Sequence, residues 1–196
     1  MKTTRIARFA LFFAALLLVP TFAQAHVGVG STHGFFHGMA HPFSGLDHLC
    51  AMMAVGLWAA QRGGRALWAV PLSFLSVMVL GAALGMAGVT IPFVEQGIVA
   101  SVLLLGVLVA AAVRLPVAAS AILVGLFALF HGHAHGTEMP VTASGFAYGA
   151  GFLAATAMLH AAGIGLGMML QRVASSTWVR AIGGGIACCG LYLLVG

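Results

Sequence analysis

Charge is what this sequence has least of. Asp, Glu, Lys and Arg make up only 6% of its 196 residues, whereas a soluble globular domain has about 25%. Three residues are acidic, and the eight basic residues form no cluster interleaved with aromatic side chains, which excludes an ordinary nucleic-acid-binding surface. A Walker A sequence is also absent, so ATP hydrolysis is not encoded in this chain.

Cysteine is scarce as well, and most of the chain consists of apolar residues. The three cysteines (Cys50, Cys188 and Cys189) fall in apolar segments, which is not a disulfide framework; we interpret them as small packing residues rather than a thiolate metal site. Hydrophobic residues make up 62% of the chain, and 27 residues are glycine, which lets membrane helices approach closely. The predicted fold class is therefore an all-α, polytopic membrane helix bundle.

Residues 1–25 are predicted to be a signal peptide. A basic start precedes the apolar run Phe9–Val19, and Ala23-Gln24-Ala25 is a small-residue cleavage pattern. The apolar run is 11 residues long, which is short of the ~20 that cross a bilayer. This favours cleavage over an uncleaved first span, so the mature chain would begin at His26, outside the membrane.

Residues 26–196 are expected to form one transmembrane domain of six spans. The expected spans are Phe36–Gln61, Ala66–Ala87, Phe93–Val113, Leu115–His133, Ser144–Gln171 and Trp178–Val195. The basic residues left after cleavage all fall on the side opposite the mature N-terminus: Arg62, Arg65, Arg114, Arg172 and Arg180. By the positive-inside rule that side is the cytoplasm, which puts both termini outside.

Ionisable side chains gather in two stretches, HPFSGLDHL (His41–Leu49) and FHGHAHGTE (Phe130–Glu138). Together these hold five of the nine histidines and two of the three acids. Such groups are costly in lipid unless they pair, line a cavity or bind something. No Lys or Arg lies near them to form structural salt bridges, which favours an external cation as the partner.

In the first stretch, His41 and His48 are seven residues apart, which is the same face of a continuous helix, and Asp47 points about 100° away. Pro42 and Gly45 are expected to loosen this helix near its outer end.

In the second stretch, His131, His135 and Glu138 stand at i, i+4 and i+7, again one helical face. His133 faces elsewhere if the helix continues. An i, i+4 histidine pair with a carboxylate can chelate a divalent metal.

These residues are expected to lie at a similar depth in the membrane, which groups them into one expected site. Counting ~1.5 Å per residue from the arginines places both stretches, and Glu95 at the start of the third span, in the outer half of the membrane. The expected metal site is His41, Asp47, His48, Glu95, His131, His135 and Glu138. Secondary metal candidates are His26, His33 and His37 on an outer capture segment, His133, and His160 near mid-membrane. Complementing a helix dipole remains an alternative for Glu95, and hydrogen-bonded packing remains one for His160.

The ligand types narrow the metal without choosing it. Imidazole with carboxylate suits Ni, Co, Zn, Fe or Cu and disfavours Ca and Mg. Between nickel, cobalt and zinc the residues leave the choice open.

HPFSGLDHLCAMMAVGLWA (His41–Ala59) and FHGHAHGTE resemble the two signatures of the HupE/UreJ family. The resemblance covers essentially the whole mature chain. It implies a nickel, sometimes cobalt, permease of the bacterial inner membrane that serves hydrogenase or urease maturation. It also implies that five residues are critical for transport: His41, Asp47, His48, His135 and Glu138.

The expectation is therefore a permease that imports Ni²⁺ or Co²⁺ and is not an enzyme. Its partners would be the metal ion and the bilayer, without a tightly bound cofactor. Facilitated diffusion, proton coupling and a separate energising or metallochaperone partner all remain open. Two alternatives of other classes are an intramembrane zinc-dependent hydrolase and an outward-facing metal sensor.

Overall fold

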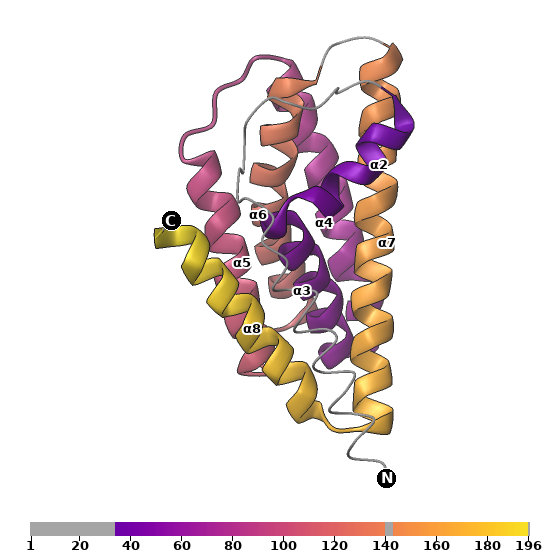
Figure 1. Cartoon of the computed structure of the whole chain (residues 1–196), viewed down its shortest axis with the longest axis vertical. Coiled ribbons are helices and arrows are strands. Elements are labelled where there is room, and N and C mark those ends of the chain that lie inside the picture. The colour runs from indigo at the N-terminus through magenta and orange to yellow at the C-terminus, as the bar shows by residue number, and fades with distance from the viewer. Residues whose placement is uncertain (1–33, 140–142, 196) are drawn as a thin grey trace.

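The computed structural model describes residues 34–139 and 143–195. The predicted signal peptide, and with it His26 and His33, lies outside the described residues. Over the described ranges the chain forms helices and no strands (Figure 1). The helices are α2 (Phe35–Ser44), α3 (Leu46–Arg62), α4 (Ala66–Met86), α5 (Val94–Ala110), α6 (Val117–Glu138), α7 (Ala143–Val173) and α8 (Ser176–Val195).

These helices form a membrane bundle. Four of them, α4, α6, α7 and α8, are each long and apolar enough to cross a membrane, and α2 with α3 meets the same test as a bent pair. Helix α5 is apolar but, at 17 residues, shorter. The predicted all-α, polytopic membrane bundle is confirmed, and the expected count of six spans stays a prediction.

The expectation of one continuous first span, Phe36–Gln61, is wrong. Helices α2 and α3 are bent by 86° at Gly45, which has an extended backbone (φ −100°, ψ 125°). Pro42 inside α2 has no N–H to continue the helical hydrogen bonds. The expected loosening is a complete break, so Asp47 lies in the first turn of a new helix.

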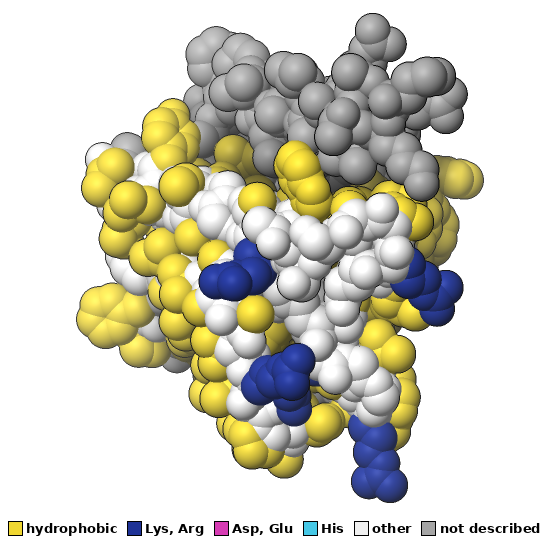
Figure 2. All heavy atoms as spheres, turned by 90° about the horizontal axis from the view of Figure 1, so that it is seen from below, with side chains coloured by type: hydrophobic (Ala, Val, Ile, Leu, Met, Phe, Trp, Pro, Cys, Tyr) yellow, Lys and Arg dark blue, Asp and Glu magenta, His cyan; other side chains and the backbone are white. Residues whose placement is uncertain are grey.

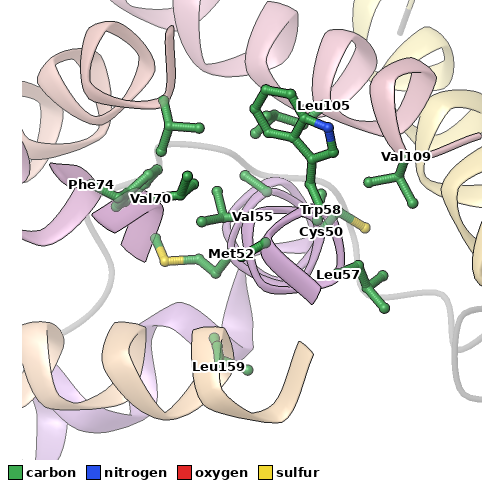
Figure 3. Packing of buried hydrophobic residues seen from close by; sticks show 14 of the residues in the cluster. Cys50, Met52, Val55, Leu57, Trp58, Val70, Phe74, Leu105, Val109 and Leu159 are labelled. Carbon is green, nitrogen blue, oxygen red and sulfur yellow. The ribbon is translucent and has the colours of Figure 1, made fainter. Parts of the chain in front are cut away.

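Helix α3 is the centre of the bundle. Twelve of its 17 residues are buried, and Figure 3 shows its side chains reaching outward to the surrounding helices. Trp58 is fully buried, and its Nε1 donates a hydrogen bond to the carbonyl of Val113 at 3.0 Å. Large apolar side chains such as Leu72 and Ile122 are exposed on the outside of the bundle, where they suit contact with lipid.

Helix α6, which carries the second histidine stretch, packs directly on the backbone of α4. A Cβ added at Gly132 would collide with the carbonyl of Met78, and one at Gly81 would collide with that of Leu129. Contacts this close need glycine. Helix α6 is therefore held against α4 with little room to slide.

The described arginines mark one end of the bundle, which we call the arginine end; Figure 2 looks at it directly. They lie at the ends of α3 and α7, just before α4 and α6, and near the start of α8: Arg62, Arg172, Arg65, Arg114 and Arg180. Glu95 and Glu138 lie in the first turn of α5 and at the end of α6, which is the opposite end, here called the histidine end.

Candidate metal site

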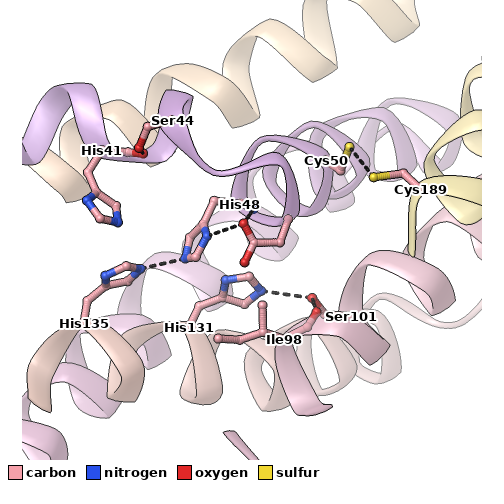
Figure 4. Close-up of polar contacts among 10 residues, drawn as sticks. His41, Ser44, His48, Cys50, Ile98, Ser101, His131, His135 and Cys189 are labelled. Carbon is pink, nitrogen blue, oxygen red and sulfur yellow. Dashed lines mark hydrogen bonds and ion pairs between the residues drawn. The ribbon is translucent and has the colours of Figure 1, made fainter. Parts of the chain in front are cut away.

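Four imidazoles from three helices meet near the histidine end. We call His41, His48, His131 and His135 the imidazole cluster. Ring centroids are 4.6 Å apart for His48 and His135, 4.9 Å for His48 and His131, and 4.8 Å for His41 and His135. His48, His131 and His135 are at most 4% exposed. Figure 4 shows these rings turned toward one another from α2, α3 and α6.

The break at Gly45 determines how His41 joins the cluster. His41 and His48 do not share the face of one straight helix, because α2 turns by 86° before α3 begins. The turn brings the His41 ring over α6, closer to His135 (4.8 Å) than to His48 (6.2 Å). The two residues are near one another as expected, but for a different structural reason.

Asp47 holds the ring of His48. Its Oδ1 accepts a hydrogen bond from the backbone N–H of His48 at 2.8 Å and lies 2.9 Å from His48 Nδ1. A carboxylate accepts, so Nδ1 carries the proton and Nε2 is left as the lone-pair nitrogen. Asp47 is buried in the first turn of α3, where the helix dipole also favours its negative charge.

Ser101 of α5 orients the ring of His131 in a similar way. The Ser101 hydroxyl donates its one hydrogen to the carbonyl of Ile98 at 2.6 Å. Its oxygen therefore accepts from His131 Nε2, 2.9 Å away. This leaves Nδ1 as the lone-pair nitrogen of His131, so two rings of the cluster have a tautomer fixed by a neighbour.

His48 Nε2 and His135 Nε2 are 2.6 Å apart, which is the distance of a hydrogen bond. Two nitrogens that share an ion at about 2.1 Å each stand about 2.9 to 3.4 Å apart. Within residues 34–139 and 143–195, no three His, Cys, Asp or Glu side chains are arranged as a metal-coordinating group. The cluster is thus a hydrogen-bonded set of imidazoles, and for His48 and His135 to share an ion their Nε2 atoms would have to move apart by about 0.3 Å or more.

Aromatic and apolar side chains enclose the cluster on its α7 side. The Phe152 ring lies 4.3 Å from that of His135, and Tyr148 lies 5.9 Å from His41. An adjoining cavity of about 520 Å³ between α4, α6 and α7 is lined by His135 and mostly apolar residues such as Met78 and Met139. Ion and water therefore meet a site whose walls are largely apolar, which strengthens electrostatic interactions inside it.

The other expected residues that the structure describes are either exposed or buried elsewhere on α6 and α7. Glu95, Glu138 and His37 are exposed, with Glu138 one turn beyond His135. Helix α6 continues straight through the second stretch, so His133 faces away as expected, and its Nε2 donates to the carbonyl of Val89 at 2.6 Å. His160 is buried on α7 at a deeper level.

Sequence reasoning missed Ser101 and Phe152. A lone serine in an apolar helix is a weak signal, and its partner on α6 is thirty residues away. It also did not pair two of the cysteines: the Sγ atoms of Cys50 and Cys189 lie 3.7 Å apart between α3 and α8, while Cys188 is exposed.

Comparison with known proteins gives the chain a family. Residues 14–193 match the model of the HupE / UreJ protein family. The chain belongs to the HupE/UreJ family. One relative, named Protein HupE, from Rhizobium leguminosarum bv. viciae, is 48% identical over 182 residues, which cover 93% of this chain and 95% of that protein. No solved structure matches. The HupE/UreJ match includes both histidine stretches and extends from before α2 into the last turn of α8.

Proposed function

We propose that this chain is a permease for a divalent transition-metal ion, Ni²⁺ or Co²⁺, and that it moves the ion from the periplasm to the cytoplasm. The observation that carries the proposal is the imidazole cluster. Three buried imidazole rings and one half-buried ring meet inside a membrane bundle. Hydrogen bonds to Asp47 and Ser101 fix the tautomers of two of these rings, so that each keeps one nitrogen with a lone pair. Borderline metal ions bind such nitrogens.

The two ends of the bundle support the proposed direction of transport. The arginine end suits the cytoplasmic side by the positive-inside rule, which turns the histidine end to the periplasm. Exposed Glu95 and Glu138 at that end attract cations to it, since clustered charge of one sign raises the local concentration of its counter-ion. The cluster then receives the ion one turn deeper.

Binding exchanges one hydrogen bond for two metal bonds. The ion takes the place of the hydrogen that His135 Nε2 donates to His48 Nε2. That proton moves to His135 Nδ1, so both rings stay neutral, and the rings move apart as the ion enters. Asp47 acts in this scheme by orienting His48 and balancing the charge, since its Oδ1 is already engaged by that residue. Such carboxylate–histidine pairs fix the ring and strengthen the ligand.

A permease fits better than a hydrolase. Of the described carboxylates nearest the cluster, Asp47 is engaged by His48 through Oδ1 and Glu138 is exposed to solvent. A metal hydrolase needs both an open coordination position and a base beside it. The family and the HupE relative support a transport role in hydrogenase or urease maturation.

Accumulation of radiolabelled nickel in cells tests the proposal. We expect His48→Ala to abolish uptake, because it removes both the ring shared with His135 and the partner of Asp47. His133→Leu is the matched control: it removes another buried imidazole from the same bundle but lies outside the cluster, and uptake should persist. Uptake by His48→Ala cells at the wild-type rate would refute the proposal.

A further inference from the structure

His160 is a buried histidine that lies outside the imidazole cluster. It lies on α7, is 1% exposed, and neither Nδ1 nor Nε2 has a hydrogen-bond partner in the part of the chain that the structure describes. The other buried histidines each engage a named neighbour through a ring nitrogen, such as Ser101 for His131 and Val89 for His133. His160 is therefore the exception.

An imidazole in this position is costly for packing alone. Burying a polar group without a hydrogen-bond partner destabilises the folded state, whereas leucine would fill a similar volume with no such penalty. Buried polar groups of this kind call for an explanation such as an ion or water that occupies the site. The ring nitrogens of His160 thus indicate a ligand that is present part of the time.

Phe74 links His160 to the cluster. The Phe74 ring, on α4, lies 5.6 Å from the ring of His131 and 5.0 Å from that of His160. His160 is eight residues past Phe152 on α7, so it lies about 12 Å closer to the arginine end than Phe152, which packs against His135. Figure 3 shows Met52 reaching between Phe74 and Leu159 at this point.

We propose that His160 is an inner transit site for the transported divalent metal ion, separated from the imidazole cluster by the Phe74 ring. This inference rests on the proposed function. An ion leaving His131 passes the face of Phe74, which attracts cations, as the flexible Met52 side chain yields. It then meets the His160 imidazole, whose two nitrogens make no hydrogen bond to any residue that the structure describes.

The surroundings of His160 fit a brief stop rather than a tight site. Thr156, one turn away on the same face of α7, is fully buried, and its hydroxyl hydrogen goes to the carbonyl of Phe152, so its oxygen keeps lone pairs for an ion. Few protein ligands mean weak binding, which lets the ion leave. The backbone here is fixed: a Cβ at Gly56 of α3 would collide with the carbonyl of His160.

Flux and binding measured together on the purified protein test this site. Nickel flux into proteoliposomes and equilibrium nickel binding in detergent are compared for wild type, His160→Leu, His160→Gln and the control His133→Leu. We expect His160→Leu to lower the maximal flux at least tenfold while the half-saturating concentration and the affinity of the cluster change less than about threefold, because capture is intact and onward passage is lost. His133→Leu should retain both the wild-type nickel flux and the wild-type nickel affinity.

Each result has one meaning. If wild type carries nickel and His160→Leu does so within about twofold of it, the transit site is wrong and the proposed function stands. If a folded His160→Leu protein loses binding as well as flux, His160 supports the cluster structurally, and the inference is also overturned. If His160→Leu does not fold, His160→Gln decides by the same criteria. If wild type carries no nickel, the proposed function fails and the transit site with it.

Discussion

Replacing Asp47 tests how the cluster binds metal. Asp47 Oδ1 holds the Nδ1 proton of His48 at 2.9 Å and accepts from the backbone N–H of His48 at 2.8 Å. In Asp47→Ala both contacts disappear and the His48 ring is free to take the other tautomer, which would turn a protonated Nε2 toward the ion. In Asp47→Asn an oxygen acceptor remains, but the charge is lost.

The size of the effect follows from similar pairs. Loss of a carboxylate behind a metal-binding histidine typically lowers metal affinity 10- to 100-fold, which is about 1.4 to 2.7 kcal/mol. Hydrogen bonds to a charged acceptor are roughly twice as strong as neutral ones, so the neutral acceptor in Asp47→Asn should still orient His48 in part and lower the affinity less than Asp47→Ala does. We expect a loss of about 100-fold for Asp47→Ala and about tenfold for Asp47→Asn.

Isothermal titration of the purified protein with nickel measures these affinities. His133→Leu is the control, because it removes a buried imidazole that lies outside the cluster, and the affinity should stay at the wild-type value. Wild-type affinity in Asp47→Ala would refute the orienting role. Asp47→Asn as defective as His48→Ala would refute it too, because that result would make Asp47 a direct ligand.

Three further predictions concern packing, protons and the cysteine pair. Gly132→Val should destabilise the protein by about 1 to 3 kcal/mol, because the new side chain collides with the carbonyl of Met78; an unchanged thermal midpoint would contradict this packing of α4 on α6. Nickel uptake should fall as the external pH drops toward ~6, because protons compete with metal for imidazole lone pairs; uptake that rises on acidification would contradict binding by the cluster. A membrane-permeant oxidant should link Cys50 to Cys189, whose Sγ atoms are 3.7 Å apart, and Cys188→Ser should leave this link intact; cross-linking that depends on Cys188 instead would contradict the packing of α8 on α3.

Much of the fold could be read from the sequence because membrane helices are marked by apolar length and by arginines at one end. The expected convergence of the two stretches at one level followed from rise per residue alone, and the structure brings His41, His48, His131 and His135 together. Whether these residues bind metal stays a prediction.

The break in the first span could not be sized from sequence. Pro42 and Gly45 weaken a helix, but a bend of 86° depends on where α2 finds a partner. That partner is α7, where a Cβ at Gly38 would collide with the carbonyl of Tyr148. Such a contact joins residues more than a hundred positions apart, and local patterns do not encode it.

The sequence also could not predict which of the acidic side chains point into the bundle. Depth grouped Asp47, Glu95 and Glu138 together, but rotation about each helix axis decides which side chain points inward. The structure buries Asp47 against His48 and leaves the two glutamates exposed. Ser101 was missed for the same reason, because its contact with His131 depends on how α5 faces α6.

Metal flux into proteoliposomes that contain only this purified protein tests the central claim most directly. Nickel, cobalt and zinc are offered outside, and the ion trapped inside is counted over time. The account predicts saturable accumulation of nickel or cobalt without any added partner, abolished by His48→Ala. Liposomes that accumulate no more metal with the wild-type protein than with His48→Ala would contradict it.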